Sequence, residues 1–222
     1  MKNLLLAACL FAAPLYSYAQ CNAYYTLEKG NKWTITNYNG KDKVTGKLSY
    51  EVKELQRMDD GWKAELLFTS YDKKDKEQLQ QTMDMTCNDG IVQMDMSRFF
   101  PQDMMATMRD ANMNIETKNI EFPEDMEVGD ELPDASVRIS GDLPFTMETV
   151  ITNRKVIKEE SVTTSAGTFE CVVIEYTVST KSIMSIESKG IDWIAEDVGL
   201  VKSEHYNKSG KLTDKSLLTS FE

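Results

Sequence analysis

Apolar and polar side chains alternate along most of this chain, which is the pattern of β-strands with one covered face. The longest run of strand-favouring residues is 168–179, with the sequence TFECVVIEYTVS. One face of this run carries Val172, Ile174, Tyr176 and Val178, and the other carries Phe169, Cys171 and Val173. Because both faces are apolar toward the start of the run, we expect a central strand that is covered there from both sides.

Five alternating runs precede this strand and are separated by turn residues. They cover 32–38, 44–53, 62–68, 79–87 and 92–96. Asn39-Gly40, Asp60-Gly61, a charged loop at 72–77 and Asn88-Asp89-Gly90 lie between them. Asn, Asp and Gly tolerate the backbone angles of tight turns, so the pattern predicts an antiparallel meander.

The period of the pattern changes after residue 96. A helical face is formed by Pro101, Met104, Met105 and Met108. Since Pro101 suits a first helical position and Asp103 suits the positive end of a helix, we expect a short helix from about Pro101 to Asp110. The following segment to Pro144 is predicted to be mostly loop, with one or two short strands such as Val137–Ser140.

Alternation resumes in the last third of the chain. Strands are expected at 147–157, 168–179, about 200–206 and 212–221, with Met184 and Ile186 continuing the pattern after the second. About ten strands and one short helix predict a mainly β protein. We expect a strongly curved antiparallel sheet, a half-open or closed barrel, with the helix packed in or against its concave face.

The first 19 residues read as a cleaved signal peptide. Lys2 is followed by an apolar region, 4–15, and Ser17-Tyr18-Ala19 matches the small-x-small cleavage pattern. The apolar region is short for a membrane span, so we expect no integral membrane segment after cleavage. Residues 20–222 then form a single antiparallel β domain, exported to the periplasm or the cell exterior.

An outer-membrane lipoprotein is the less favoured alternative. Cys21 follows the signal closely and could be acylated, but Gln20 stands where a lipoprotein signal has a small residue. The formal net charge is −11, and no basic block interrupts the acidic composition. This argues against nucleic-acid partners and against electrostatic docking to anionic membranes.

Three cysteines remain after the signal peptide: Cys21, Cys87 and Cys171. An exported protein can form a disulfide, and three single pairings are open. Cys171 lies among apolar neighbours in a strand, where we expect a small buried side chain. The Cys21–Cys87 pairing is therefore favoured.

The chain offers little catalytic chemistry. His205 is the only histidine, and no nucleophile motif surrounds it, so we expect a structural or surface role. The cysteines and carboxylates lack the spacing of zinc or calcium sites, and phosphate-binding glycine motifs are absent. We therefore expect no enzyme activity, catalytic residue, cofactor or metal. A hydrolase built on two carboxylates stays open, because their separation is spatial.

Methionine is unusually frequent in one part of the chain. Nine of the thirteen methionines lie between residues 83 and 126. Met side chains are flexible and polarizable, so they can line an apolar groove or fill gaps in a core. The groove hypothesis uses Met83, Met85, Met94, Met96, Met104, Met105 and Met108. Copper binding is a further alternative, although the spacing differs from tight M-x-M-x-M motifs.

The C-terminal third carries motifs of a known group of proteins. These are 164–171 (TSAGTFEC), Trp193, 198–204 (VGLVKSE) and 209–212 (SGKL), accompanied earlier by 30–34 (GNKWT) and 87–90 (CNDG). Together they resemble the TapB-like families of uncharacterised envelope proteins over most of the chain after the signal. The resemblance implies a β-protein of Gram-negative bacteria, similar to the half-open barrels of lipoprotein carriers. It implies no catalytic residues.

Two functions follow from these expectations. The first is an exported, non-enzymatic envelope protein that binds an apolar ligand or lipid in the concave face of its sheet. The alternative is a structural or partner-binding envelope protein without a small-molecule ligand.

Overall fold

The structure is a computed structural model in which residues 21–96, 113–141, 146–182 and 184–222 are described. These residues form fourteen β-strands and contain no α-helix. The strands are β1 Lys32–Asn39, β2 Val44–Met58, β3 Gly61–Asp72, β4 Glu77–Asn88, β5 Ile91–Met94, β6 Asn114–Lys118, β7 Ile120–Phe122, β8 Glu131–Leu132, β9 Ala135–Ser140, β10 Met147–Thr164, β11 Gly167–Lys181, β12 Ser185–Ala195, β13 Gly199–Asn207 and β14 Leu212–Phe221.

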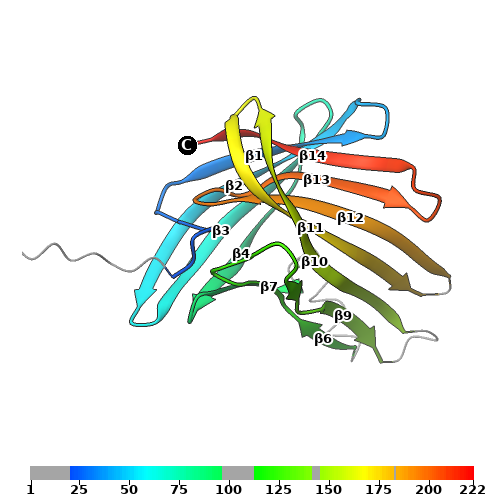
Figure 1. Cartoon of the computed structure of the whole chain (residues 1–222), viewed down its shortest axis with the longest axis horizontal. Helices are drawn as coiled ribbons and strands as arrows, with labels where there is room; N and C mark the ends of the chain where they lie inside the picture. The colour runs from blue at the N-terminus through cyan, green and yellow to red at the C-terminus, as the bar shows by residue number, and fades with distance from the viewer. Residues whose placement is uncertain (1–20, 97–112, 142–145, 183) are drawn as a thin grey trace, which may run out of the picture.

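All fourteen strands belong to one antiparallel sheet that curls into a nearly closed barrel (Figure 1). Its order is β6-β9-β10-β11-β12-β13-β14-β1-β2-β3-β4-β5-β7, and β8 pairs with β10. The two ends of this order are consecutive in the chain, because only Asn119 separates β6 from β7. The short segment 114–122 therefore joins the two edges of the sheet by changing its pairing partner from β9 to β5.

The predicted class is confirmed, but the count of about ten strands is wrong. β9 matches the short strand expected at Val137–Ser140, whereas β6, β7 and β8 lie in a segment expected to be mostly loop. These three strands are two to five residues long, too short for an alternating pattern to identify them. The predicted helix at 101–110 lies outside the described residues.

β11 is covered on both faces, as its sequence predicted. Cys171, Val172, Val173 and Ile174 are all buried. Val172, Ile174 and Tyr176 join the main core, which also contains Trp62, Ala64 and Leu66 of β3 and Met85 and Cys87 of β4. Since β3 and β11 are well separated in the sheet order, this core is the barrel interior. Cys171 and Val173 belong to a second cluster with residues of β1 and β12 to β14.

The segment that precedes β1 packs into the barrel. Tyr24, Tyr25 and Leu27 are buried members of the main core. The structure contains the Cys21–Cys87 disulfide that the sequence favoured, and it ties this segment to β4. The Asn22 amide donates to the Gly90 and Phe122 carbonyl oxygens at 2.9 and 3.0 Å. Buried polar groups that are fully bonded in this way fix one arrangement of the segment.

Gly199 begins β13 with a φ of +81° and lies against the Tyr25 ring. A Cβ atom at this position would stand 2.3 Å from Tyr25 Cε1. Glycine is therefore required both by the backbone angle and by the approach of the N-terminal segment.

Candidate functional site

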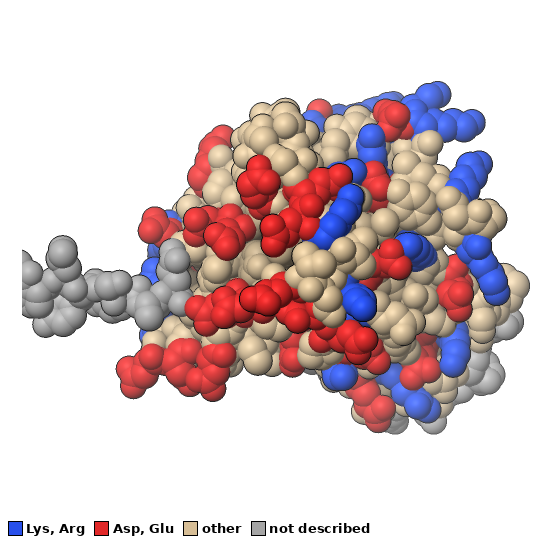
Figure 2. Space-filling model, viewed as in Figure 1, with Lys and Arg blue, Asp and Glu red and all other residues tan. Residues whose placement is uncertain are grey.

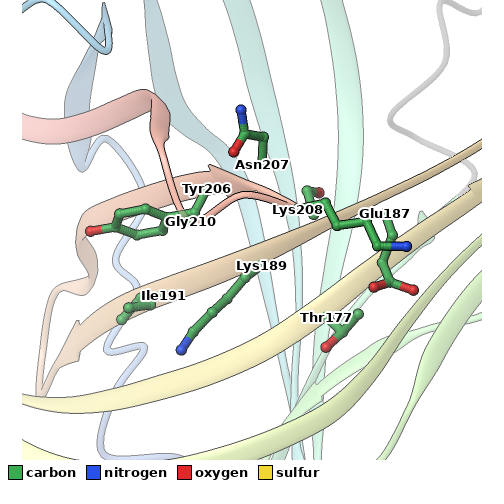
Figure 3. A pocket seen from close by; sticks show the side chains of 9 residues that line it. Thr177, Glu187, Lys189, Ile191, Tyr206, Asn207, Lys208 and Gly210 are labelled. Carbon is green, nitrogen blue, oxygen red and sulfur yellow. The ribbon is translucent and has the colours of Figure 1, made fainter.

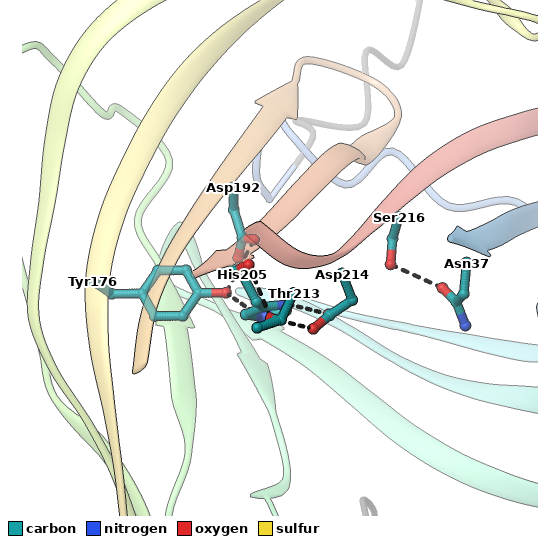
Figure 4. A network of polar contacts seen from close by, with 7 residues as sticks. All are labelled: Asn37, Tyr176, Asp192, His205, Thr213, Asp214 and Ser216. Carbon is teal, nitrogen blue, oxygen red and sulfur yellow. Dashed lines mark hydrogen bonds and ion pairs between the residues drawn. The ribbon is translucent and has the colours of Figure 1, made fainter. Parts of the chain in front are cut away.

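The only histidine belongs to a polar network that crosses four neighbouring strands (Figure 4). The Tyr176 hydroxyl of β11 lies 3.1 Å from Asp192 Oδ1 of β12 and 3.2 Å from His205 Nε2 of β13. His205 Nδ1 lies 2.8 Å from Asp214 Oδ1 of β14. Strand register explains the assembly, because Tyr176 lies opposite Gly190, Gly190 opposite His205, and His205 opposite Asp214.

Gly190 makes room for this network. A Cβ atom there would stand 2.2 Å from the Tyr176 ring. The ring therefore lies directly over the β12 backbone, and its hydroxyl reaches the residues beyond. An aromatic ring that covers a glycine on the neighbouring strand is a recurring arrangement in β-sheets.

Proton positions decide what the network can do. The Tyr176 hydroxyl has one proton, so it can donate to Asp192 or to His205 but not to both. Both contacts are satisfied when the imidazole is protonated, with Nε2–H donating to the tyrosine oxygen and Nδ1–H donating to Asp214.

Burial makes the tyrosine a poor nucleophile. Desolvation, followed by the nearby charge of Asp192, raises the pKa of Tyr176 well above its ordinary value, so the phenol stays protonated at neutral pH. Desolvation also raises the pKa of Asp192, against the opposing effects of Ser203, His205, Tyr176 and Arg154. The geometry is that of a cross-link between strands, with His205 as its centre.

Arg154 occupies the seam between β7 and the β8–β10 region. Its guanidinium donates to the Pro133 carbonyl oxygen at 2.8 Å and to the Glu121 carbonyl oxygen at 3.0 Å, and it lies 5.2 Å from the centre of the Phe122 ring. The preceding residue, Asn153, has a φ of +53° at an irregularity of the β10–β11 pairing. Such bulges re-aim side chains, and here the Arg154 side chain reaches one carbonyl group of β7 and one that follows β8.

The methionines of the groove hypothesis are only partly described. Met85 and Met96 are buried, in the main core and in a cluster with Ala135, Val137 and Ile139. Met83 and Met94 are half-buried and pack against the main core. Met104, Met105 and Met108 lie outside the described residues. The structure thus brings Met83, Met85 and Met94 together on β4 and β5.

Two surface hollows differ in chemistry. One, of about 400 Å³, lies beside β12 and the β13–β14 turn and is lined by Lys189, Tyr206, Lys208 and neighbours (Figure 3). The other, of about 570 Å³, lies at the opposite end of the barrel. Its lining includes six carboxylates: Glu124, Asp125, Glu127, Glu159, Glu170 and Glu196.

Among the described residues, no group of three or more His, Cys, Asp or Glu side chains could hold a metal ion.

In the described ranges, no helix is long and apolar enough to cross a membrane. The chain belongs to the DUF3108-like family, which matches residues 28–218. The TapB-like assignment suggested by the motifs is not specifically supported by this match. Comparison with curated proteins gives no significant match.

Two solved structures share this fold. A Bacteroides fragilis protein, described as exported and as having a YmcC-like fold, is 24% identical, with a TM-score of 0.74. A Parabacteroides distasonis protein described as a lipoprotein is also 24% identical, with a TM-score of 0.75. Each comparison covers 91% of this chain and 100% of the other. At this identity the likeness shows the fold alone.

Sequence reasoning missed Tyr176, Asp192, Asp214 and Arg154 as parts of a site. Their juxtaposition depends on strand register and on a bulge, and neither is encoded by local residue spacing. A buried-face Asp in the apolar run of β12 was the one available signal, since such residues are rarely buried without partners.

Proposed function

We propose that this protein is an exported, non-enzymatic β-barrel of the bacterial envelope that acts through its outer surface. The observation that carries this proposal is the filling of the barrel by its own chain. Tyr24, Tyr25 and Leu27 occupy the main core, and the Cys21–Cys87 disulfide holds them there. A ligand that entered this part of the interior would have to displace a covalently tethered segment.

Native mass spectrometry of the processed, exported protein tests this proposal. We expect the mass of the polypeptide alone, both with the disulfide intact and after mild reduction. A co-purifying lipid would contradict it and would favour the second candidate, an apolar-ligand carrier. The observation that favours the carrier is that Met83, Met94, Ile151 and Val178 are only partly buried at the margin of the main core.

The histidine network supports the non-enzymatic part of the proposal. His205 is engaged by Tyr176 and Asp214, and the tyrosine phenol remains protonated at neutral pH. A His205→Gln variant should therefore change stability rather than remove an activity. Hydrolysis of an ester or glycoside panel by the parent protein, lost in that variant, would contradict the proposal.

The disulfide also supports a soluble N terminus over a lipid-anchored one. Bacterial lipoproteins carry lipid on the sulfur of an N-terminal cysteine, whereas the Cys21 sulfur is bonded to Cys87. Intact mass measurement on protein recovered from the envelope should find an unmodified chain that gains two hydrogens on reduction. A diacylglyceryl adduct on Cys21 would reject this assignment.

A further inference from the structure

We propose that the barrel docks on anionic phospholipid bilayers through one end, which is rich in lysine and carries an apolar hairpin tip. This inference rests on the outer-surface function proposed above and names the partner of that surface. The sequence alone argued against docking to anionic membranes, because it contains no basic block and has a net charge of −11.

The lysines converge because antiparallel hairpins place alternate turns at the same end of the barrel. The β1–β2, β3–β4, β11–β12 and β13–β14 turns all lie at this end. Gly40 N donates to the Thr213 carbonyl oxygen at 2.7 Å, which brings the β1–β2 turn against the start of β14. The lysine-rich end comprises exposed Lys41, Lys43, Lys73, Lys74, Lys76, Lys181, Lys208 and Lys211.

Most acidic groups of these turns are already engaged. Asp42 pairs with Lys215 at 2.6 Å and Asp75 pairs with Lys47 at 2.7 Å. The Asp72 carboxylate accepts the backbone N–H groups of Lys74 and Lys76. Glu77, Glu187 and Asp214 are exposed carboxylates that border the turns, and Asp214 is in contact with His205. Between the described residues, no ion pair within 4.0 Å involves any of the eight lysines of the lysine-rich end.

Apolar side chains project from the same end. Met184 and Ile186, at the β11–β12 hairpin, are 73% and 63% exposed. Exposed apolar groups beside clustered lysines match the two requirements of peripheral membrane binding, because the lysines attract anionic headgroups and the apolar groups enter the boundary below them. A soluble polyanion would need the lysines but not Met184 and Ile186.

The opposite end sets the orientation. Figure 2 shows Lys and Arg gathered mainly at the right of the view, while Asp and Glu cover much of its left and centre. The hollow lined by six carboxylates lies at that acidic end, and Cys21 lies there too because it is bonded to Cys87 near the end of β4. An anionic surface repels this end, so the lysine-rich end faces the bilayer and the N-terminal segment points away from it.

Sedimentation of the processed protein with vesicles tests the proposal. We expect binding to vesicles of phosphatidylethanolamine and phosphatidylglycerol at about 3:1, and little binding to phosphatidylcholine. Added salt should weaken the binding, because it screens exposed charges. The Lys208→Glu/Lys211→Glu variant should lose roughly thirtyfold or more in partitioning, since each lysine near such a surface contributes about a fivefold effect.

Two further variants separate the parts of the surface. Met184→Ser/Ile186→Ser should also lose binding, while Lys29→Glu/Lys53→Glu, which makes the same charge change toward the acidic end, should bind like the parent. Unchanged melting temperatures show that all three variants fold. Equal binding to both vesicle types, or full binding by the Lys208→Glu/Lys211→Glu variant, would overturn the proposal.

Heparin distinguishes a soluble polyanion from a bilayer. Heparin binding together with parent-like vesicle binding by Met184→Ser/Ile186→Ser would assign the surface to acidic polymers and overturn the proposal. If native mass spectra show a retained lipid and the protein still binds anionic vesicles, the proposal of an outer-surface function is contradicted and the docking proposal stands. If the spectra show no lipid and the protein binds neither vesicle type, only the docking proposal is contradicted.

Discussion

The two ends of the barrel are built from the same antiparallel hairpins but are stabilised differently. At the acidic end the chain folds back on itself, with the Cys21–Cys87 disulfide and the Tyr25 ring against Gly199. At the lysine-rich end, Gly210 has nothing within 4 Å of a Cβ position, and Met184 and Ile186 are exposed. We infer that one end specifies the fold and the other is free to make contacts.

Removal of the disulfide should have the largest effect on this comparison. The bridge closes a loop with a sequence separation of 66 residues, so Cys21→Ser/Cys87→Ser should lower the free energy of unfolding by about 4 kcal/mol. Urea unfolding measures this loss. The control is Cys171→Ala, which leaves the bridge intact and should cost about 1 kcal/mol. An unchanged urea midpoint for the double variant would contradict the inference that the acidic end stabilises the fold.

Arg154 should be the next most sensitive position. Arg154→Ala leaves the Pro133 and Glu121 carbonyl oxygens without their donor and should cost about 3 kcal/mol. At the lysine-rich end, Lys47→Ala removes an exposed pair with Asp75 and should cost less than about 1 kcal/mol. Chemical denaturation compares the two variants. Equal losses of unfolding free energy in the two variants would mean that the hydrogen bonds of Arg154 do not stabilise the seam.

Substitution of two glycines with similar backbone angles allows the acidic end and the lysine-rich end to be compared directly. Gly199 has a φ of +81° beside the Tyr25 ring, and Gly210 has a φ of +76° in open space. Gly210→Ala should cost about 1 kcal/mol for the backbone angle alone, and Gly199→Ala about 2 kcal/mol more for the clash. Thermal melting measures both. A similar loss of stability at both positions would show that the N-terminal segment moves readily to accommodate an added methyl group.

The smallest expected effect is a dependence on pH at Asp192. Its folded pKa is raised above the unfolded value, so the stabilisation it provides is complete below about pH 3.9 and is lost as the pH rises through the folded pKa. Asp192→Asn should therefore gain stability relative to the parent as the pH increases. Unfolding free energies measured across this range test the sign.

Glu204 provides the opposite control for this experiment. Burial opposes its ionisation, but hydrogen bonds from Tyr206 and Lys202 outweigh burial and lower its pKa. Its contribution is present above the unfolded pKa and is lost as the pH falls, so Glu204→Gln should lose stability relative to the parent toward higher pH. Parallel curves for the two variants would contradict the assigned directions.

Local patterns predicted the strands but not the sites. Strands β1 to β5 follow from alternation and from Asp89-Gly90-type turns, and the pairing of Cys21 with Cys87 followed from the apolar surroundings of Cys171. The two-residue strand β8 exists only through its partner β10, so no local pattern could identify it. Long-range pairing decides such segments.

The lysine-rich end illustrates the same limit for surfaces. Its lysines come from four turns that are far apart in the chain, and only the sheet order makes them neighbours. The network of His205 depends likewise on the register of four strands. Charge and chemistry that are dispersed in sequence can therefore be concentrated by an antiparallel barrel.

A fluorescent probe at each end tests the central comparison most directly. Met184→Cys and Val128→Cys replace exposed apolar residues at the lysine-rich and acidic ends, where the native side chains are 73% and 56% exposed. The probe reacts selectively, because Cys171 is buried and its thiol pKa is raised to about 11. We predict that phosphatidylglycerol-containing vesicles shift the emission of the probe at 184 to shorter wavelength and leave the probe at 128 unchanged. A shift at 128, or at neither position, would contradict the account.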